Sequence, residues 1–93
     1  MNPKVTSVSA LTSYRLRLNF TNGEQRVFDV SPYLDKGVFR QLRESSRFES
    51  AKVVAGSVEW PGEIDLSYDT LYLDSVPVSA QSKKTDEVLR ERT

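Results

Sequence analysis

Apolar and polar residues alternate along residues 14–20 of the chain. A period of two is typical of a strand with one buried face. The dipeptide Asn22-Gly23, the most typical of β-hairpin turns, comes shortly afterwards. Residues 25–30 then continue the alternation, so a first hairpin is predicted over residues 14–30. In the first strand, one face carries the apolar residues Tyr14, Leu16, Leu18 and Phe20. The other face carries the polar residues Arg15, Arg17 and Asn19.

The length of the loop decides which side chains of this hairpin face each other. A two-residue loop places Leu16 opposite Asp29. A three-residue loop, with Gly23 in the left-handed region, places Leu16 opposite Phe28 and Arg15 opposite Asp29. Only the three-residue loop puts the apolar residues of both strands on one face. We therefore predict that loop.

A second hairpin is predicted around a two-residue turn at Ala55-Gly56. The register that this turn imposes places apolar residues opposite each other on one face and opposite charges on the other. These pairs are Val53 with Val58 and Lys52 with Glu59. A further strand is predicted near residues 5–8, where the apolar Val5 and Val8 differ in parity, which favours a bulge or a short edge strand.

Short helices are predicted between the two hairpins and after the second. Serine stands before three of them, where its hydroxyl can accept an unpaired backbone N–H. The predicted segments are residues 32–36 (Ser31 as N-cap, Pro32 first, ended by Gly37), 38–43, 46–49 (Ser46 and Glu49 as a capping box) and 68–72 (Ser67 as N-cap). The predicted fold class is α+β: a small antiparallel sheet of two hairpins and an N-terminal strand, with short helices.

The chain has 93 residues, which suits one domain, and its 13 Lys and Arg balance 13 Asp and Glu. We predict a single domain over residues 1–77. Residues 78–93 are predicted to form a flexible tail, because beyond Val78 only Ala80, Val88 and Leu89 are apolar. No apolar stretch approaches the roughly 18 residues that a membrane span needs. We therefore expect no contact with a membrane, and we expect a cytoplasmic location.

The absence of Cys and His removes whole classes of chemistry. A disulfide framework and a thiolate metal site need Cys, and His is the commonest general base. We therefore predict no catalytic residue, no cofactor and no metal site. Six carboxylates are the remaining candidates for acid–base or metal chemistry, and we expect them to serve turns, helix starts and cross-strand pairs: Asp29, Glu59, Glu63, Asp65, Asp69 and Asp74.

The order and spacing of several motifs resemble a known family, the small bacterial domain of unknown function 2442, over about residues 4–73. Members usually have an Asn between the positions of Pro61 and Gly62, and this chain lacks it. The matching motifs are Phe20-x-x-Gly23, Phe28-Asp29-Val30-Ser31-Pro32, Phe39-x-x-Leu42-Arg43, Phe48 and Val58-x-Trp60-Pro61-Gly62-x-x-Asp65-Leu66-x-x-Asp69-Thr70-Leu71-Tyr72.

The resemblance implies a compact α+β fold and little chemistry. Genes of this family often lie beside those of another small family, in an arrangement like toxin–antitoxin pairs. The resemblance therefore implies a protein partner encoded by a neighbouring gene, with this chain as the antitoxin-like member.

Two groups of residues are candidate binding surfaces. Aromatic residues dominate interaction hot spots, and guanidinium groups bind phosphates. The candidate protein-interaction surface is Trp60, Gly62, Tyr68 and Tyr72; the candidate nucleic-acid contacts are Arg15, Arg17, Arg40, Arg43 and Arg47. The only Trp also suits the core of so small a domain.

The predicted function is a non-enzymatic protein-interaction module, acting through an exposed sheet edge or the end around Trp60 and Tyr72. A nucleic-acid-binding regulator is the alternative. A carboxylate-based or metal-dependent enzyme is the third hypothesis.

Overall fold

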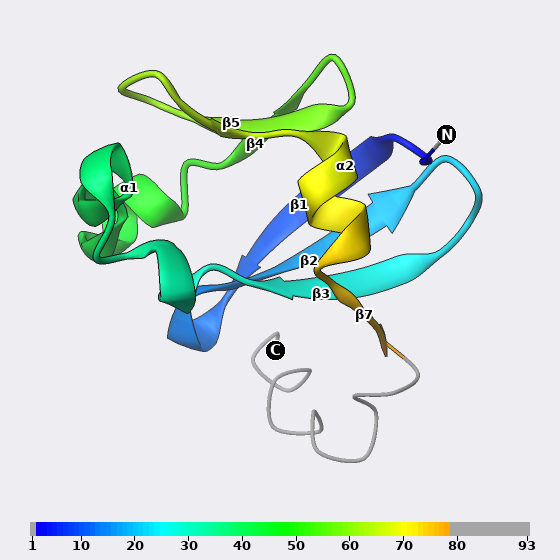
Figure 1. Ribbon diagram of the computed structural model, residues 1–93, viewed down its shortest axis with the longest axis horizontal. Helices are drawn as coiled ribbons and strands as arrows, with labels where there is room; N and C mark the ends of the chain where they lie inside the picture. The colour runs from blue at the N-terminus through cyan, green and yellow to red at the C-terminus, as the bar shows by residue number, and fades with distance from the viewer. Residues whose placement is uncertain (1, 79–93) are drawn as a thin grey trace.

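Residues 2–78 of the computed structural model are described below. Their strands form two antiparallel sheets, with the orders β1-β2-β3-β7 and β4-β5-β6. Figure 1 shows α2 crossing in front of the larger sheet, with the β4–β5 hairpin at the upper edge. The elements are β1 (Val5–Leu11), β2 (Arg15–Phe20), β3 (Gln25–Asp29), α1 (Ser45–Phe48), β4 (Lys52–Val54), β5 (Ser57–Trp60), β6 (Ile64–Leu66), α2 (Tyr68–Leu73) and β7 (Val76–Pro77), with 3-10 turns at Thr12–Tyr14, Ser31–Tyr33 and Gly37–Arg43.

This arrangement confirms the predicted α+β class, but the strands divide between two sheets where the sequence predicted one. Strands β6 and β7 were not predicted. Each is only two or three residues long, so neither shows a clear alternation. Both are held by pairing with a strand that the sequence did predict, β5 for β6 and β3 for β7.

The first hairpin has the predicted three-residue loop. Leu16 lies opposite Phe28, and Arg15 lies opposite Asp29. Gly23 has φ +89°, a left-handed conformation that side chains disfavour, and its N–H donates to the Phe20 carbonyl at 2.9 Å. The register therefore follows from turn chemistry and from the need to bury one face.

The second hairpin and the N-terminal strand are also confirmed. Ala55 and Gly56 both have positive φ, as a type I′ turn requires. β1 is longer than expected, and its pairing with β2 is irregular between Val5 and Ser7, where a bulge was expected. The cross-strand pairs of the second hairpin are those predicted: Val53 with Val58 and Lys52 with Glu59.

Two of the three predicted serine caps are wrong. Ser31 does not cap the 3-10 turn that begins there; its own N–H and hydroxyl donate to Asp29 Oδ1 at 3.0 and 2.7 Å. The capping box at Ser46 is absent, because α1 begins one residue earlier and has no side-chain cap. Ser67 is the predicted cap of α2, and its hydroxyl accepts the Thr70 N–H at 3.4 Å.

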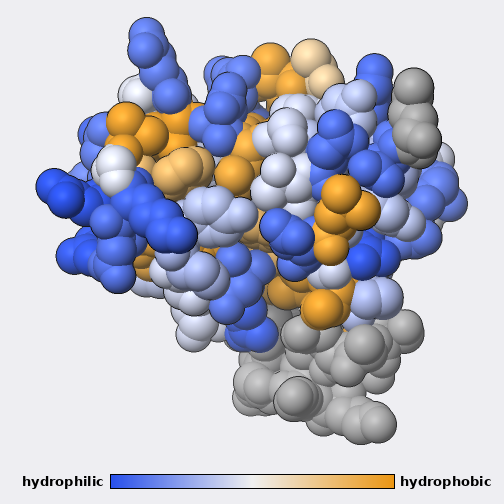
Figure 2. Space-filling model, in the orientation of Figure 1, coloured by the Kyte–Doolittle hydropathy of each residue, from blue (hydrophilic) through white to orange (hydrophobic). Residues whose placement is uncertain are grey.

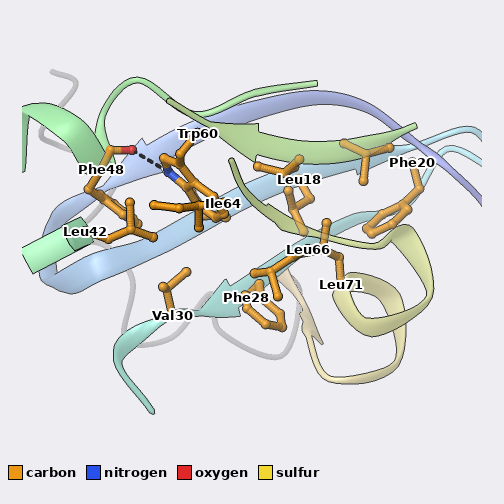
Figure 3. Close-up of a cluster of buried hydrophobic side chains, with 13 residues drawn as sticks. Leu18, Phe20, Phe28, Val30, Leu42, Phe48, Trp60, Ile64, Leu66 and Leu71 are labelled. Atoms are coloured by element: carbon orange, nitrogen blue, oxygen red, sulfur yellow. Dashed lines mark hydrogen bonds between the residues drawn. The ribbon is translucent and has the colours of Figure 1, made fainter. Parts of the chain in front are cut away.

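A single core lies between the two sheets and the short helices (Figure 3). Each element contributes the residues on its inward parity, because burying apolar area is the main favourable term in folding. The buried members are Val5, Leu16, Leu18, Phe20, Phe28, Val30, Leu42, Phe48, Val58, Trp60, Ile64, Leu66 and Leu71.

No helix among residues 2–78 is long and apolar enough to cross a membrane. The predicted flexible tail lies outside the described residues, apart from Val78. The prediction of a single domain over residues 1–77 stays a prediction.

Candidate functional site

Trp60 belongs to the core, which corrects its place in the candidate interaction surface. Its side chain is buried, at 3 % exposure. The indole Nε1–H donates to the Phe48 carbonyl at 3.0 Å, and the Trp60 and Phe48 rings stack with centroids 6.4 Å apart. Figure 3 shows this bond at one end of the core. A partner therefore finds no accessible indole here.

Gly62 lies beside the helical segment that follows the first hairpin. A Cβ built on it would stand 3.2 Å from Gln41 Oε1 and 3.4 Å from Arg47 Nη1. That same Arg47 nitrogen donates to the Pro61 carbonyl at 3.2 Å. The loop after β5 is therefore held against residues 41–47.

Tyr68 and Tyr72 lie on α2 and contact other parts of the chain. The Tyr72 ring packs edge-on against Phe20, and its hydroxyl donates to Glu24 Oε2 at 3.1 Å. The Nζ of Lys4 lies 5.5 Å from the centre of the Tyr68 ring. The structure therefore does not bring the four predicted residues together: Trp60 and Gly62 contact the helical segment, whereas Tyr72 contacts the β2–β3 hairpin.

Sequence reasoning missed the polar network around Arg26, which lies beside Tyr72. The Arg26 guanidinium bonds the hydroxyl and carbonyl of Ser75 at 2.7 and 2.8 Å and pairs with Glu24 at 2.9 Å. It also stacks on the Tyr72 ring, 4.5 Å from its centre. The bond from Arg26 holds the pKa of Glu24 below its ordinary value. The signal in the sequence was parity, since Arg26 shares the inward face with Phe28.

The arginines between the hairpins are largely engaged within the chain. Arg43 donates to the Leu34 carbonyl at 3.0 Å and pairs with Asp35. Arg47 donates to Pro61, as described above. Arg40 is exposed. The predicted basic stripe is therefore interrupted by intramolecular contacts, since two of its three guanidinium groups bind backbone carbonyls.

Arg15 and Arg17 point away from the core, on what we call the outer face of the larger sheet. None of the ion pairs found within residues 2–78 includes either of them. Asp29 lies opposite Arg15 but accepts from Ser31 instead. The outer face comprises Ser7, Ser9 and Leu11 of β1, Arg15, Arg17 and Asn19 of β2, Gln25, Val27 and Asp29 of β3, and Val76 of β7.

An apolar pair lies beside these arginines. Val27 is directly opposite Arg17 on one side and Val76 on the other. Val76 is 40 % exposed, whereas Val27 is buried, at 6 % exposure. The outer face thus combines two arginines without a carboxylate partner among the described residues and the exposed apolar side chain of Val76.

The side of the molecule that carries α2 has a different character. Figure 2 shows its hydrophobic side chains in small separate groups among hydrophilic ones. Leu73, at 65 % exposure, is one exposed large apolar residue of this helix. Scattered apolar residues are normal on a protein surface and do not indicate a binding site.

The six candidate carboxylates are dispersed. Within residues 2–78 no three acidic, His or Cys side chains form a group that could hold a metal ion. Glu59 lies between Lys52 and Asp65 on the smaller sheet, and Asp69 accepts from Asn2 Nδ2 at 2.9 Å. Glu59 thus lies in the cross-strand pair with Lys52 that the sequence predicted, whereas Asp69 contacts a residue remote in sequence.

A hollow of about 710 Å³ lies at the turn end of the first hairpin. It adjoins the outer face through Asn19 and Gln25, and Pro77 and Val78 form another wall. A smaller hollow of about 340 Å³ contains Tyr33, whose pKa is raised by burial and by the negative charge of Asp74. Neither hollow brings together a nucleophile and a base.

Comparison with known proteins identifies the family. No significant match was found among curated proteins or among solved structures. The family model described as a protein of unknown function, DUF2442, matches residues 5–77, which is most of the chain and agrees with the resemblance seen in the motifs. The chain therefore belongs to the DUF2442 family.

Proposed function

We propose that this chain is a non-enzymatic protein-interaction module whose partner binds the outer face of the larger sheet. The observation that carries the proposal is that Arg15 and Arg17, which have no carboxylate partner within residues 2–78, lie on the same sheet face as the exposed Val76. Arginine is enriched at interfaces because it offers charge and several N–H donors together with an apolar stem. The partner chemistry that fits is a segment with carboxylates next to aliphatic side chains.

Strand addition at the β7 edge of the larger sheet is a weaker route than binding to the face. The edge strand β7 has only two residues, and one of them is Pro77, which has no N–H to donate. Proline and short length protect an edge from pairing with another chain. The sequence predicted an exposed sheet edge as one possible binding site, and at β7 this edge is protected from pairing with a strand of a partner.

The first partner to test is the product of a neighbouring gene, with this chain as the antitoxin-like member of the pair. The two proteins are co-expressed, and binding is measured by calorimetry for the natural chain and for Arg15→Glu/Arg17→Glu. We expect affinity to fall at least about tenfold, which corresponds to ~1.4 kcal/mol. The loss should shrink at high salt, because salt screens exposed charges.

The matched control reverses the same number of charges elsewhere. Arg40→Glu/Lys36→Glu changes two exposed cations outside the outer face. This control should bind as the natural chain does. If both double variants lose affinity equally, the loss reflects net charge alone and the outer face is not the binding site. If neither double variant loses affinity, the proposal is contradicted.

Nucleic-acid binding is the second candidate, and Arg15 and Arg17 favour it, because neither has a carboxylate partner within residues 2–78. Its signature is an affinity for DNA or RNA that falls steeply with salt, since each phosphate contact releases counterions. The engagement of Arg43 and Arg47 within the chain reduces the number of such contacts. Titration of the natural chain with duplex DNA and single-stranded RNA at low salt separates the two candidates.

A further inference from the structure

The strand β1 forms the edge of the larger sheet opposite to β7, and its residues do not protect that edge. Natural edge strands often carry a charged side chain or a proline, which discourage pairing with another chain. β1 has the sequence Val-Thr-Ser-Val-Ser-Ala-Leu, with neither feature. Every other strand in the described part of the chain has one of them: Arg15 in β2, Arg26 in β3, Lys52 in β4, Glu59 in β5, Asp65 in β6 and Pro77 in β7.

The open backbone groups of this edge belong to Val8 and Ala10. In an antiparallel sheet, successive residues turn their N–H and C=O groups to opposite sides of the strand. The Phe20 N–H donates at 2.9 Å to the carbonyl that precedes β3, so Arg17, three residues before it, turns toward β1. Ser9 lies opposite Arg17 and therefore turns toward β2. The N–H and C=O groups of Val8 and Ala10 consequently point away from β2, and no backbone bond outside the ladders of residues 2–78 includes them.

The smaller sheet covers the start of this edge. The Val5 N–H donates to the Gly56 carbonyl at 2.9 Å, and β4 contacts β1. Figure 1 shows β1 then descending toward its Leu11 end while β4 remains at the upper edge. The pairing of β1 with β2 is irregular between Val5 and Ser7 and regular from there to Leu11. Residues 7–11 are therefore the stretch with which a further strand can pair, and Ser9 is its centre.

A second copy of the chain fits this stretch. Like charges that face each other across two strands destabilise the pair, and an uncharged strand meets no such penalty from its own copy. An antiparallel arrangement about a two-fold axis at Ser9 places Val8 of each copy opposite Ala10 of the other, so that their outward N–H and C=O groups meet. This arrangement also keeps the two outer faces on one side, because opposed residues share the same parity.

We propose that two copies of this chain associate through antiparallel pairing of residues 7–11 of their β1 strands, about an axis at Ser9. The two larger sheets then become one, and the outer faces of both copies form a continuous surface that carries Arg15 and Arg17 of each. The pairing uses the edge of the sheet and not its face. It is therefore independent of the partner proposed above, and the two proposals can fail separately.

Hydrogen exchange in the natural full-length chain tests the pairing directly. Water reaches the outward amides of Val8 and Ala10 in the monomer, whereas the dimer bonds them. A small interface binds weakly, so the rates are measured by NMR over a dilution series from about 1 mM downwards. We expect both amides to exchange at least about tenfold more slowly at the highest concentration, and the amide of Leu18, inside the sheet, to exchange at a constant rate. Rates for Val8 and Ala10 that do not depend on concentration would overturn the proposal and leave this edge to a strand of another protein.

Charges placed at the proposed axis give an independent test. The Ser9 side chain is exposed, so Ser9→Lys and Ser9→Glu should each keep the fold, as circular dichroism can verify. Each variant alone should be monomeric in analytical ultracentrifugation, because two like charges would face each other, and an equal mixture of the two should restore the dimer. Ser45→Lys, the same change at an exposed serine of α1, should dimerise as the natural chain does. A dimer that persists in Ser9→Lys, or a mixture that stays monomeric, would contradict the pairing.

Discussion

The indole of Trp60 links the smaller sheet to the helical segment that precedes it. Its Nε1–H donates to the Phe48 carbonyl, and its ring fills the core beside that residue. Trp buries a large area and needs a partner for its one donor, so its position is set by both packing and hydrogen bonding. The alternation of apolar and polar residues could place Trp60 on the inward face of its strand. It could not show that the Phe48 carbonyl lies within hydrogen-bond distance of the indole.

Trp60→Phe should destabilise the protein by about 2–4 kcal/mol, because it removes the buried indole N–H bond to the Phe48 carbonyl, which keeps only the 3.4 Å bond from the Ala51 N–H, and because it leaves a cavity beside Phe48. Urea unfolding followed by circular dichroism measures the change. Leu73→Ala, which alters an exposed apolar residue, should stay within about 0.5 kcal/mol. Equal stability of Trp60→Phe and the natural chain would contradict the core assignment.

Acid should weaken the fold through Glu24. Its pKa is lowered in the folded protein, first by the hydrogen bond from Arg26 and also by that from Tyr72. The stabilisation is therefore complete above the ordinary value of 4.5 and is lost as the pH falls through the lower folded-state value. Urea unfolding at a series of pH values from 7 downwards shows this loss.

The matched variants for this titration are Glu24→Gln and Glu49→Gln. Glu24→Gln should flatten the fall in unfolding free energy below pH 4.5, because its side chain no longer titrates. Glu49→Gln, which changes an exposed carboxylate, should leave the dependence of the unfolding free energy on pH as it is in the natural chain. A slope in Glu24→Gln identical to that of the natural chain would remove Glu24 from the acid response.

At the scale of elements, the two hairpin turns differ in their surroundings. Gly23 and Gly56 both have positive φ, at +89° and +84°. Open space surrounds Gly23, where a Cβ would meet no atom within 4 Å, whereas a Cβ on Gly56 would stand 2.8 Å from the Cβ of Lys4. The first turn therefore needs glycine for its backbone alone, and the second also needs it to let the N-terminal segment pass.

Gly56→Ala should cost more than Gly23→Ala. Gly23→Ala adds only the left-handed backbone strain, about 1 kcal/mol, whereas Gly56→Ala adds overpacking against Lys4 of at least about 1 kcal/mol more. Thermal and urea unfolding of the two variants provide the comparison. Lys4→Gly in the Gly56→Ala background should recover the difference, and equal costs at the two turns would show that Lys4 moves aside freely.

The short elements explain where sequence patterns succeeded and failed. The long alternation of β2 and β3 predicted their register, because a shift by one residue would expose every apolar side chain. β6 contains only Ile64, Asp65 and Leu66, too few for a period to stand out. The expected cap at Ser31 lost to Asp29, whose carboxylate is a stronger acceptor than a hydroxyl.

At the scale of the whole molecule, β1 joins the two sheets. Val5 lies opposite Phe20 in the larger sheet, its N–H donates to the Gly56 carbonyl in the turn of the smaller one at 2.9 Å, and its side chain is in the core. One core shared by both sheets favours cooperative unfolding, since neither sheet keeps its buried face alone.

Val5→Ala should therefore destabilise both sheets together, by about 2 kcal/mol for the apolar volume lost. Native-state hydrogen exchange reports each sheet separately, through the amides of Leu18 and Val58. Both should lose protection equally. Loss confined to one sheet would show that the two unfold independently.

The sequence by itself determined the α+β class, both hairpin registers and the Ser67 cap, because each depends on residues close together along the chain. It also indicated the family, through the order and spacing of motifs along most of the chain. Tertiary structure decided the rest. The burial of Trp60, the separation of Gly62 from Tyr72, the Arg26 network and the engagement of Arg43 and Arg47 all depend on segments distant in sequence. A side chain's residue type shows what it can bind, but only the packing of remote segments shows which charges lack a partner of opposite charge, here Arg15 and Arg17 among residues 2–78.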